Sequence, residues 1–176
     1  MHSEADRQTL LRIARDAIVA HVRGGVAPTL EIGGALSQPA DAFVTLHRGG
    51  ELRGCIGRLQ AHEPIAHVVA HCAVAACSDD PRFPPVTAEE LDGLEIELSI
   101  LGPIEPVASL EDIDVGRHGL VVERGFHRGL LLPQVAIERK WDRKTFVEET
   151  CRKAGLPRDA WQAGATVSTF EADVFG

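Results

Sequence analysis

The sequence predicts an α+β fold, built on a mainly antiparallel sheet that is flanked by helices. Two pairs of β-type runs are each joined by a short glycine-containing turn, and the helical stretches between strands lack the regular alternation of a parallel βαβ fold. The composition agrees, because 44% hydrophobic and 25% charged residues are typical of a globular protein. At 176 residues the chain fits one domain, or one domain with a small subdomain.

The first predicted elements are a helix, a hairpin and a second helix. Apolar residues recur at helical spacing from Leu10 to Val22, and Gly24-Gly25 ends that helix. The stretch AFVTLHRGGELRGCIGRLQ holds two β-type runs separated by Arg48-Gly49-Gly50, which predicts an antiparallel hairpin. From Pro64 to Cys77 the apolar residues form the stripe of a helix that lies on a sheet.

The next predicted elements are a short helix and a strand. The run SDDPRFPP contains three prolines and interrupts regular structure, after which Thr87 and Glu90 form a capping box for the helix AEEL. The run LEIELSIL alternates apolar with polar residues, which predicts a strand. We expect its polar residues, Glu95, Glu97 and Ser99, to face water.

The last predicted elements are a second hairpin, a helix and a strand. The run GLVVERGFHRGLLLP reads as a hairpin that turns near Gly125. The run DRKTFVEETCRKAG predicts a helix with Asp142 as its N-cap and Gly155 at its end. The alternating run ATVSTFEADVF predicts a final strand.

Charge and composition argue against several classes of protein. The net charge of -8 disfavours a nucleic-acid surface, and the aromatic content of 5%, without tyrosine, disfavours a platform for stacked bases. The N-terminus lacks the apolar core of a signal peptide, and no run approaches the ~18 apolar residues of a membrane span. Four cysteines without a CxxC pair are expected to stay reduced, so we predict a cytoplasmic protein.

The stretch ELRGCIG, residues 51–57, is the most distinctive candidate site. In a strand Arg53 and Cys55 share a face, roughly 6.5–7 Å apart, and glycines at 54 and 57 leave room for a close neighbour on either side. A guanidinium lowers the pKa of a nearby thiol, so Arg53 is a candidate to activate Cys55 or to hold an anionic ligand. The alternative is structural: a buried cysteine, glycines that mark a bulge, and an arginine paired with a carboxylate.

The stretch LRGCIG resembles the six-residue signature of the AMMECR-one domain family. Further motifs match that family in order, from about residue 8 to residue 176: DPRFPP, LEIELSIL, HGLVV, GLLLPQVA, Trp141, CRKAGLP and TFEADVF. The resemblance implies a single α+β domain over residues 8–176, with an antiparallel sheet flanked by helices and a smaller subdomain. It implies no established activity. Bacterial and archaeal members are associated with a Memo-like protein and a radical SAM protein in the AmmeMemoRadiSam system, and this chain resembles the A component.

Three further residues of these family motifs are candidates for the site. His118 and Gln134 lie next to predicted strand or helix ends, and Arg82 lies in the turn Asp80-Pro81-Arg82. A nucleophilic cysteine needs a base and an oxyanion stabiliser, roles that a histidine and a glutamine can fill. We predict catalytic roles for Cys55, Arg53 and His118, and substrate contacts by Gly54, Gly57, Arg82 and Gln134. For His118, Gln134 and the turn, a purely structural role is an equal alternative.

Other patterns favour structural interpretations. His67 and His71 stand four residues apart on a helix, as two zinc ligands do, with Asp79 and Asp80 beyond. We nevertheless predict no metal, because the family usually carries carboxylate or amide residues around these positions. The remaining cysteines, Cys72, Cys77 and Cys151, read as small core residues. Neither GxxxxGK[ST] nor GxGxxG occurs at the glycine-containing motifs, and we predict no cofactor.

Two hypotheses of function follow. The first is an enzyme or enzyme component whose pocket centres on Arg53 and Cys55, with the thiol as nucleophile or redox group on a small anionic substrate. The second is a non-catalytic module that binds the Memo-like protein, the radical SAM protein or a peptide, with Cys55 as a structural residue.

Overall fold

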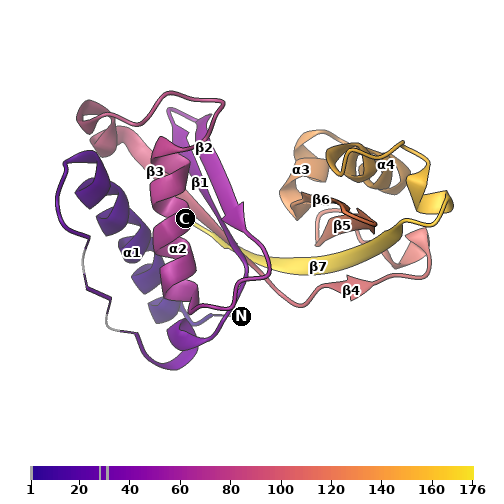
Figure 1. Ribbon diagram of the computed structural model, residues 1–176, viewed down its shortest axis with the longest axis horizontal. Coiled ribbons are helices and arrows are strands. Elements are labelled where there is room, and N and C mark those ends of the chain that lie inside the picture. The colour runs from indigo at the N-terminus through magenta and orange to yellow at the C-terminus, as the bar shows by residue number, and fades with distance from the viewer. Residues whose placement is uncertain (1, 28, 31) are drawn as a thin grey trace. The chain divides into compact units, whose positions relative to one another are not determined.

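The computed structural model describes residues 2–27, 29–30 and 32–176. It confirms the α+β fold, with antiparallel strand pairs and helices packed on them (Figure 1). The helices and strands are α1 (Glu4–Val22), β1 (Ala42–Arg48), β2 (Glu51–Arg58), α2 (Ile65–Ser78), β3 (Leu94–Leu101), β4 (Glu105–Pro106), β5 (His118–Arg124), β6 (His127–Leu131), α3 (Pro133–Glu138), α4 (Arg143–Lys153) and β7 (Thr166–Phe175). Short 3-10 helices are η1 (Gly34–Ser37), η2 (Ala88–Gly93), η3 (Leu110–Asp112) and η4 (Ala160–Gln162). By its contacts the chain forms two compact units, one that ends at Leu101 and includes Asp173–Gly176 (unit 1), and one of Gly102–Ala172 (unit 2).

Unit 1 carries the predicted first hairpin. Its strands follow the order β2-β1-β3, and β1 pairs antiparallel with both neighbours. The turn between β1 and β2 places Gly49 and Gly50 at φ of 59° and 81°, a conformation that glycine adopts without strain. Because β2 ends the order, it is an edge strand whose outer backbone groups need partners other than a strand.

Two helices cover one face of these strands. In Figure 1, α1 and α2 lie side by side against the strands of unit 1. The inward residues of β1 and β3 alternate along each strand and join both helices in one apolar core, as the sequence pattern predicted. On the strands these buried residues are Val44, Leu46, Ile96, Leu98 and Ile100; on α2 they include Ile65, Val68, Val69, Cys72 and Ala76.

The opposite face of β3 is only partly exposed. Glu95 is exposed and Glu97 is half-buried, but Ser99 has no accessible surface, so the expectation of a wholly wet face was wrong. Ser99 lies directly opposite Phe43 on β1 in the antiparallel register. Whether a small polar side chain is covered depends on neighbours outside its own strand, which period-two alternation within one strand cannot reveal.

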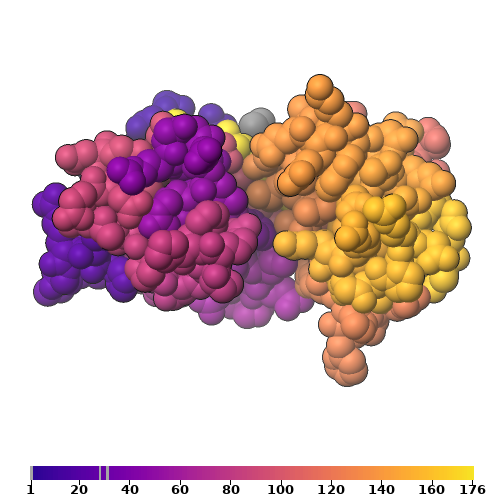
Figure 2. All heavy atoms as spheres, turned by 90° about the horizontal axis from the view of Figure 1, so that it is seen from above, coloured from indigo at the N-terminus to yellow at the C-terminus, as the bar shows by residue number. Residues whose placement is uncertain are grey.

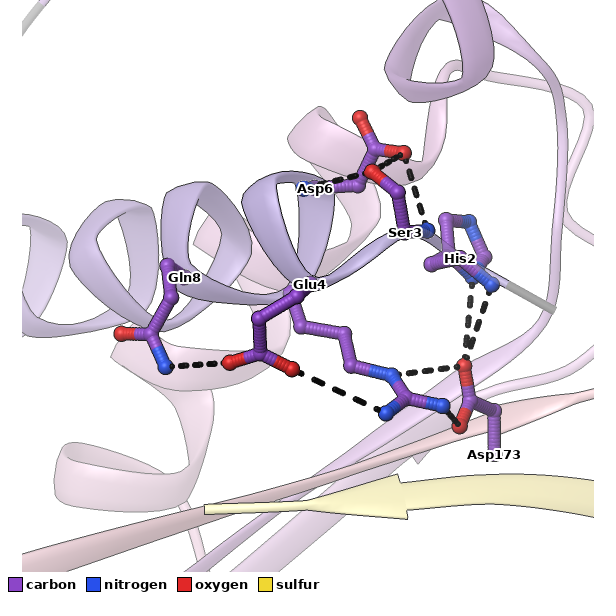
Figure 3. Close-up of polar contacts among 7 residues, drawn as sticks. His2, Ser3, Glu4, Asp6, Gln8 and Asp173 are labelled. Carbon is purple, nitrogen blue, oxygen red and sulfur yellow. Dashed lines mark hydrogen bonds and ion pairs between the residues drawn. The ribbon is translucent and has the colours of Figure 1, made fainter.

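Residues at the start of α1 form hydrogen bonds to the end of β7 within unit 1 (Figure 3). Ser3 caps the helix, since its Oγ accepts the Asp6 N–H at 3.2 Å while the Asp6 carboxylate accepts the Ser3 N–H at 3.1 Å. Arg7 donates to both carboxylate oxygens of Asp173, at 2.6 and 3.3 Å, and the His2 N–H donates to the same carboxylate at 3.2 Å. These contacts join two segments that are far apart in the sequence.

Unit 2 is built on β5, which pairs antiparallel with β6 and with β7, while β4 pairs with β7. The hairpin turns at Gly125, which has a φ of 60°, as predicted. Asp142 caps α4 by accepting the Thr145 N–H at 2.7 Å, and Gly155 ends it at a φ of 74°. Residues of α4 pack on the strands in a second core, which contains Leu120, Val122, Phe146, Val147 and Cys151.

None of the helices among the described residues is both long and apolar enough to cross a bilayer. The N-terminal helix α1 is long enough, with 19 residues, but it carries charged residues from its first turn to its middle.

Candidate functional site

The glycines of the motif permit close packing within unit 1. A Cβ at Gly54 would lie 2.2 Å from the carbonyl oxygen of Ala76, because α2 crosses the backbone of β2 there. A Cβ at Gly57 would lie 2.2 Å from the ring of Phe43 on the other face. The close neighbours predicted from the glycine spacing are therefore parts of this chain. A substrate contact at Gly54 or Gly57 stays a prediction, and in this structure protein atoms occupy the space beside both glycines.

Cys55 lies on the face of β2 that is turned away from α2, opposite Thr45 of β1. The Oγ1 of Thr45 and the Sγ of Cys55 are 3.3 Å apart, within hydrogen-bond distance for sulfur. Both backbone polar groups of Cys55 are bonded on the outer side of β2, so the pair is of the non-hydrogen-bonded type, in which side chains come closest. Of the four free cysteines Cys55 is half-buried, whereas Cys72, Cys77 and Cys151 are buried.

Asp80 and Arg82 take the place of a neighbouring strand along the outer edge at Cys55. The Cys55 N–H donates to Asp80 Oδ2 at 2.9 Å, and Arg82 Nη2 donates to the Cys55 carbonyl oxygen at 3.4 Å. Arg82 Nε and Nη2 also donate to the two oxygens of Asp80, at 2.9 and 2.7 Å. The predicted turn at Asp80-Pro81-Arg82 therefore holds both backbone groups of the candidate nucleophile.

The carboxyl of Asp80 is buried and ionised. Its side chain is only 2% exposed, and it accepts four hydrogen bonds, two of them from the Arg82 guanidinium. The hydrogen bond from Arg82 is the main cause that holds the pKa of Asp80 well below its usual range, and the Cys55 N–H adds to it. The same pair raises the pKa of Arg82. Asp80 is therefore a fixed negative charge and a poor proton acceptor.

Arg53 binds the loop that precedes η2. Its Nε and Nη2 donate to the two oxygens of Glu90 at 2.8 and 3.0 Å, and its Nη1 and Nη2 donate to the carbonyls of Pro84 and Pro85 at 2.9 and 3.3 Å. Figure 2 shows the violet hairpin of β1 and β2 bordered by the rose-coloured segment of residues 79–93. The arginine thus has the carboxylate partner that the structural alternative anticipated.

The Arg53 hydrogen bond also lowers the pKa of Glu90 to about 2. Glu90 accepts the Thr87 N–H at 2.8 Å, which confirms this half of the capping box predicted at the start of η2. A hollow of about 370 Å³ borders the two side chains, with Arg48, Gly49, Glu51 and Leu52 in its wall.

His118 and Gln134 belong to unit 2, whereas Cys55 and Arg53 belong to unit 1. His118 begins β5, and its Nδ1 accepts the Asp114 N–H at 3.0 Å. In the neutral ring this bond leaves the proton on Nε2, so His118 offers a donor there rather than a base. Gln134 is half-buried in α3. Their predicted roles beside Cys55 stay predictions.

His67 and His71 lie on α2 with ring centroids 6.4 Å apart, and His71 Nδ1 lies 3.5 Å from a Glu63 oxygen. Asp80, which the sequence placed just beyond them, is bonded to Arg82 and Cys55 instead. Within the described part of the chain no three His, Cys, Asp or Glu residues are grouped closely enough to hold a metal ion.

Thr45 is the site residue that sequence reasoning missed. The turn at Gly49-Gly50 indicates which strands pair, but the register shifts between Leu46 and His47, and this shift brings Thr45 opposite Cys55. The role of Asp80 was also missed, although the turn that contains it was identified.

Comparison with known proteins gives a consistent result. A sequence model of the AMMECR1 family matches residues 11–175. A protein of Methanothermobacter thermautotrophicus is 45% identical, over 98% of this chain and 95% of its own length. Protein MJ0810 of Methanocaldococcus jannaschii is 41% identical, over 94% of this chain and 87% of its own. The crystal structure of uncharacterized protein PH0010 from Pyrococcus horikoshii is 40% identical with a TM-score of 0.88, over 94% of this chain and 88% of that one.

Proposed function

The chain belongs to the AMMECR1 family, and the names of the relatives reported above state no activity. We propose that this family member is an enzyme or enzyme component. Its reactive group is the thiol of Cys55, which acts as nucleophile or redox group on a small anionic substrate. One observation carries the proposal: Cys55 is the half-buried cysteine, its sulfur lies 3.3 Å from the Thr45 hydroxyl, and its carbonyl oxygen accepts from Arg82, which a buried carboxylate holds in place.

The neighbours of Cys55 suit a reactive thiol. The thiolate is the nucleophilic form of cysteine, and hydroxyl and guanidinium groups are polar partners that serve a sulfur nucleophile or its substrate. Thr45 supplies the hydroxyl 3.3 Å from Sγ, and Arg82 supplies the guanidinium. Arg53 is bonded to Glu90, so the cation of the proposed site is Arg82 rather than Arg53. His118 remains a candidate for a donor through its Nε2.

Labelling with iodoacetamide at neutral pH tests the proposal. We expect Cys55 to be modified first, and Thr45→Val to slow that modification severalfold because it removes the hydroxyl beside the sulfur while keeping the shape. Mass spectrometry of proteolytic fragments identifies the modified residue. The proposal fails if Cys55 stays unmodified in the folded protein.

A second candidate function is a non-catalytic module that binds the Memo-like protein or the radical SAM protein of the AmmeMemoRadiSam system in the cytoplasm. The structural roles of three motif residues favour it. Arg53 binds Glu90 and the loop before η2, Gly54 allows α2 to approach β2 closely, and Gly57 leaves room for an aromatic ring. A module keeps its affinity for the purified partners when Cys55→Ala is introduced. An enzyme that needs the thiol loses turnover with the same variant while it stays folded.

A further inference from the structure

The Arg82 guanidinium, which donates to the Cys55 carbonyl oxygen at 3.4 Å, has N–H donors without a partner among the described residues. We propose that Arg82, oriented by Asp80, is the specificity-determining residue of the site and selects small molecules with a single carboxylate group next to the Cys55 thiol. The inference rests on the proposed function of Cys55 and assigns its substrate class.

The donors of Arg82 are only partly used. Its Nε and one Nη2 hydrogen satisfy Asp80, and Nη2 also reaches the Cys55 carbonyl. Within residues 2–27, 29–30 and 32–176, Nη1 has no hydrogen-bond partner, and the side chain as a whole is 55% exposed. A guanidinium carries five N–H donors, so the two on Nη1 are available to a ligand.

The remaining contacts hold the guanidinium in place. Asp80, only 2% exposed, receives Nε and Nη2 side by side, and the Phe83 ring centroid lies 5.5 Å from the Arg82 Cζ. Asp80 is itself held by the N–H groups of Cys55 and Arg82. A pre-oriented arginine loses little conformational freedom when it binds an anion, which favours recognition by few contacts.

The number of free donors favours a monocarboxylate over a phosphate. One terminal nitrogen of Arg82, Nη1, remains to donate to a ligand. A carboxylate needs one or two such donors, whereas a phosphate dianion is usually held by more donors and more positive charge. Arg53 is not available to bind a ligand carboxylate, because its Nε, Nη1 and Nη2 all have protein partners and its side chain is 13% exposed.

Two alkylating reagents of nearly equal size test this selection. Iodoacetate carries a carboxylate and iodoacetamide is neutral; with either one, a C–S bond forms at Sγ, the C–I bond breaks, iodide leaves with the electron pair and the thiol proton passes to solvent. The measured quantity is the ratio of the second-order rate constants for iodoacetate and iodoacetamide at Cys55. We expect the ratio in the folded protein to exceed that of the urea-unfolded chain about five- to tenfold at low ionic strength.

Variants test whether Arg82 causes the raised ratio of the two rate constants. Arg82→Gln should lower it to the unfolded value, Arg82→Lys should retain part of it, and 0.5 M salt should reduce it in the unchanged protein. Arg58→Gln is the matched control, because Arg58 is an exposed arginine on the same strand that pairs with Glu63. If Arg82→Gln fails to fold, Arg82→Lys and the salt series carry the test, and a ratio that neither of them lowers overturns the selection by Arg82.

The outcomes separate this inference from the proposed function. Selection by Arg82 is overturned if both reagents label Cys55 quickly but their ratio equals that of the unfolded chain. It is also overturned if Arg82→Gln leaves the ratio unchanged. In both cases the proposal of a reactive thiol stands. Absence of labelling by iodoacetamide in the folded protein overturns both.

Discussion

Gly54→Ala tests the close contact between β2 and α2 that underlies the motif. The added Cβ would lie 2.2 Å from the Ala76 carbonyl oxygen, a separation that real Cβ atoms do not show. The neighbouring atom is backbone, so the helix and the strand must separate by about 1 Å to restore contact distance. Overpacking of this kind costs about 1–3 kcal/mol, and a backbone clash belongs at the upper end. For a chain of this size we expect the unfolding midpoint to fall by roughly 5–10 °C.

Thermal unfolding followed by circular dichroism measures this loss. Gly93→Ala is the matched control, since a Cβ there meets no atom closer than 3.9 Å. The control should be neutral or slightly stabilising, because alanine restricts the unfolded chain more than glycine does. Gly57→Ala should cost less than Gly54→Ala, because the Phe43 ring can rotate away whereas the Ala76 backbone cannot. A midpoint for Gly54→Ala equal to that of Gly93→Ala would show that β2 and α2 are not in close contact at Gly54.

Further predictions concern the charged groups and the buried thiols. Asp80→Asn should lower the free energy of unfolding at pH 7 by about 2–4 kcal/mol, because the Arg82 guanidinium and the Cys55 N–H lose a charged acceptor. Urea unfolding measures this loss, and a urea midpoint equal to that of the unchanged protein would contradict it. The pKa of Glu90 is lowered from near 4.5 to about 2, so its contribution to stability is complete above the unfolded pKa and disappears as the pH falls to about 2. Glu90→Gln should remove that part of the pH dependence of the free energy of unfolding. An unchanged pH dependence between about 4.5 and 2 would argue against this role of Glu90. Burial raises the pKa of Cys77 to about 11, so its alkylation in the folded protein should require strongly alkaline conditions, and rapid labelling at pH 7 would count against this burial.

Local patterns were sufficient to predict most of the fold. The hairpin turn at Gly49-Gly50, the N-cap at Asp142 and the stripe of α2 each follow from a few adjacent residues, and each is confirmed. Ser99 was misassigned because burial depends on neighbours outside the strand's own sequence, such as Phe43 opposite it on β1.

The site itself depends on contacts that sequence spacing does not contain. Arg53 and Cys55 are two residues apart, yet the Arg53 side chain binds Glu90, 37 positions along the chain. Arg82, which is 27 positions from Cys55, donates to the Cys55 carbonyl because the loop returns along the edge of β2. Long flexible side chains and a one-residue register shift decide which groups meet, and neither leaves a periodic pattern.

The most direct test of the central claim is alkylation of all four cysteines across a range of pH, in the folded and the unfolded protein, resolved by mass spectrometry. We expect Cys55 alone to be labelled quickly near pH 7 in the folded protein, and Cys72, Cys77 and Cys151 to react at comparable rates only after unfolding. If Cys55 reacts only after unfolding, like the three buried cysteines, it is a structural residue and the claim of a reactive thiol is contradicted.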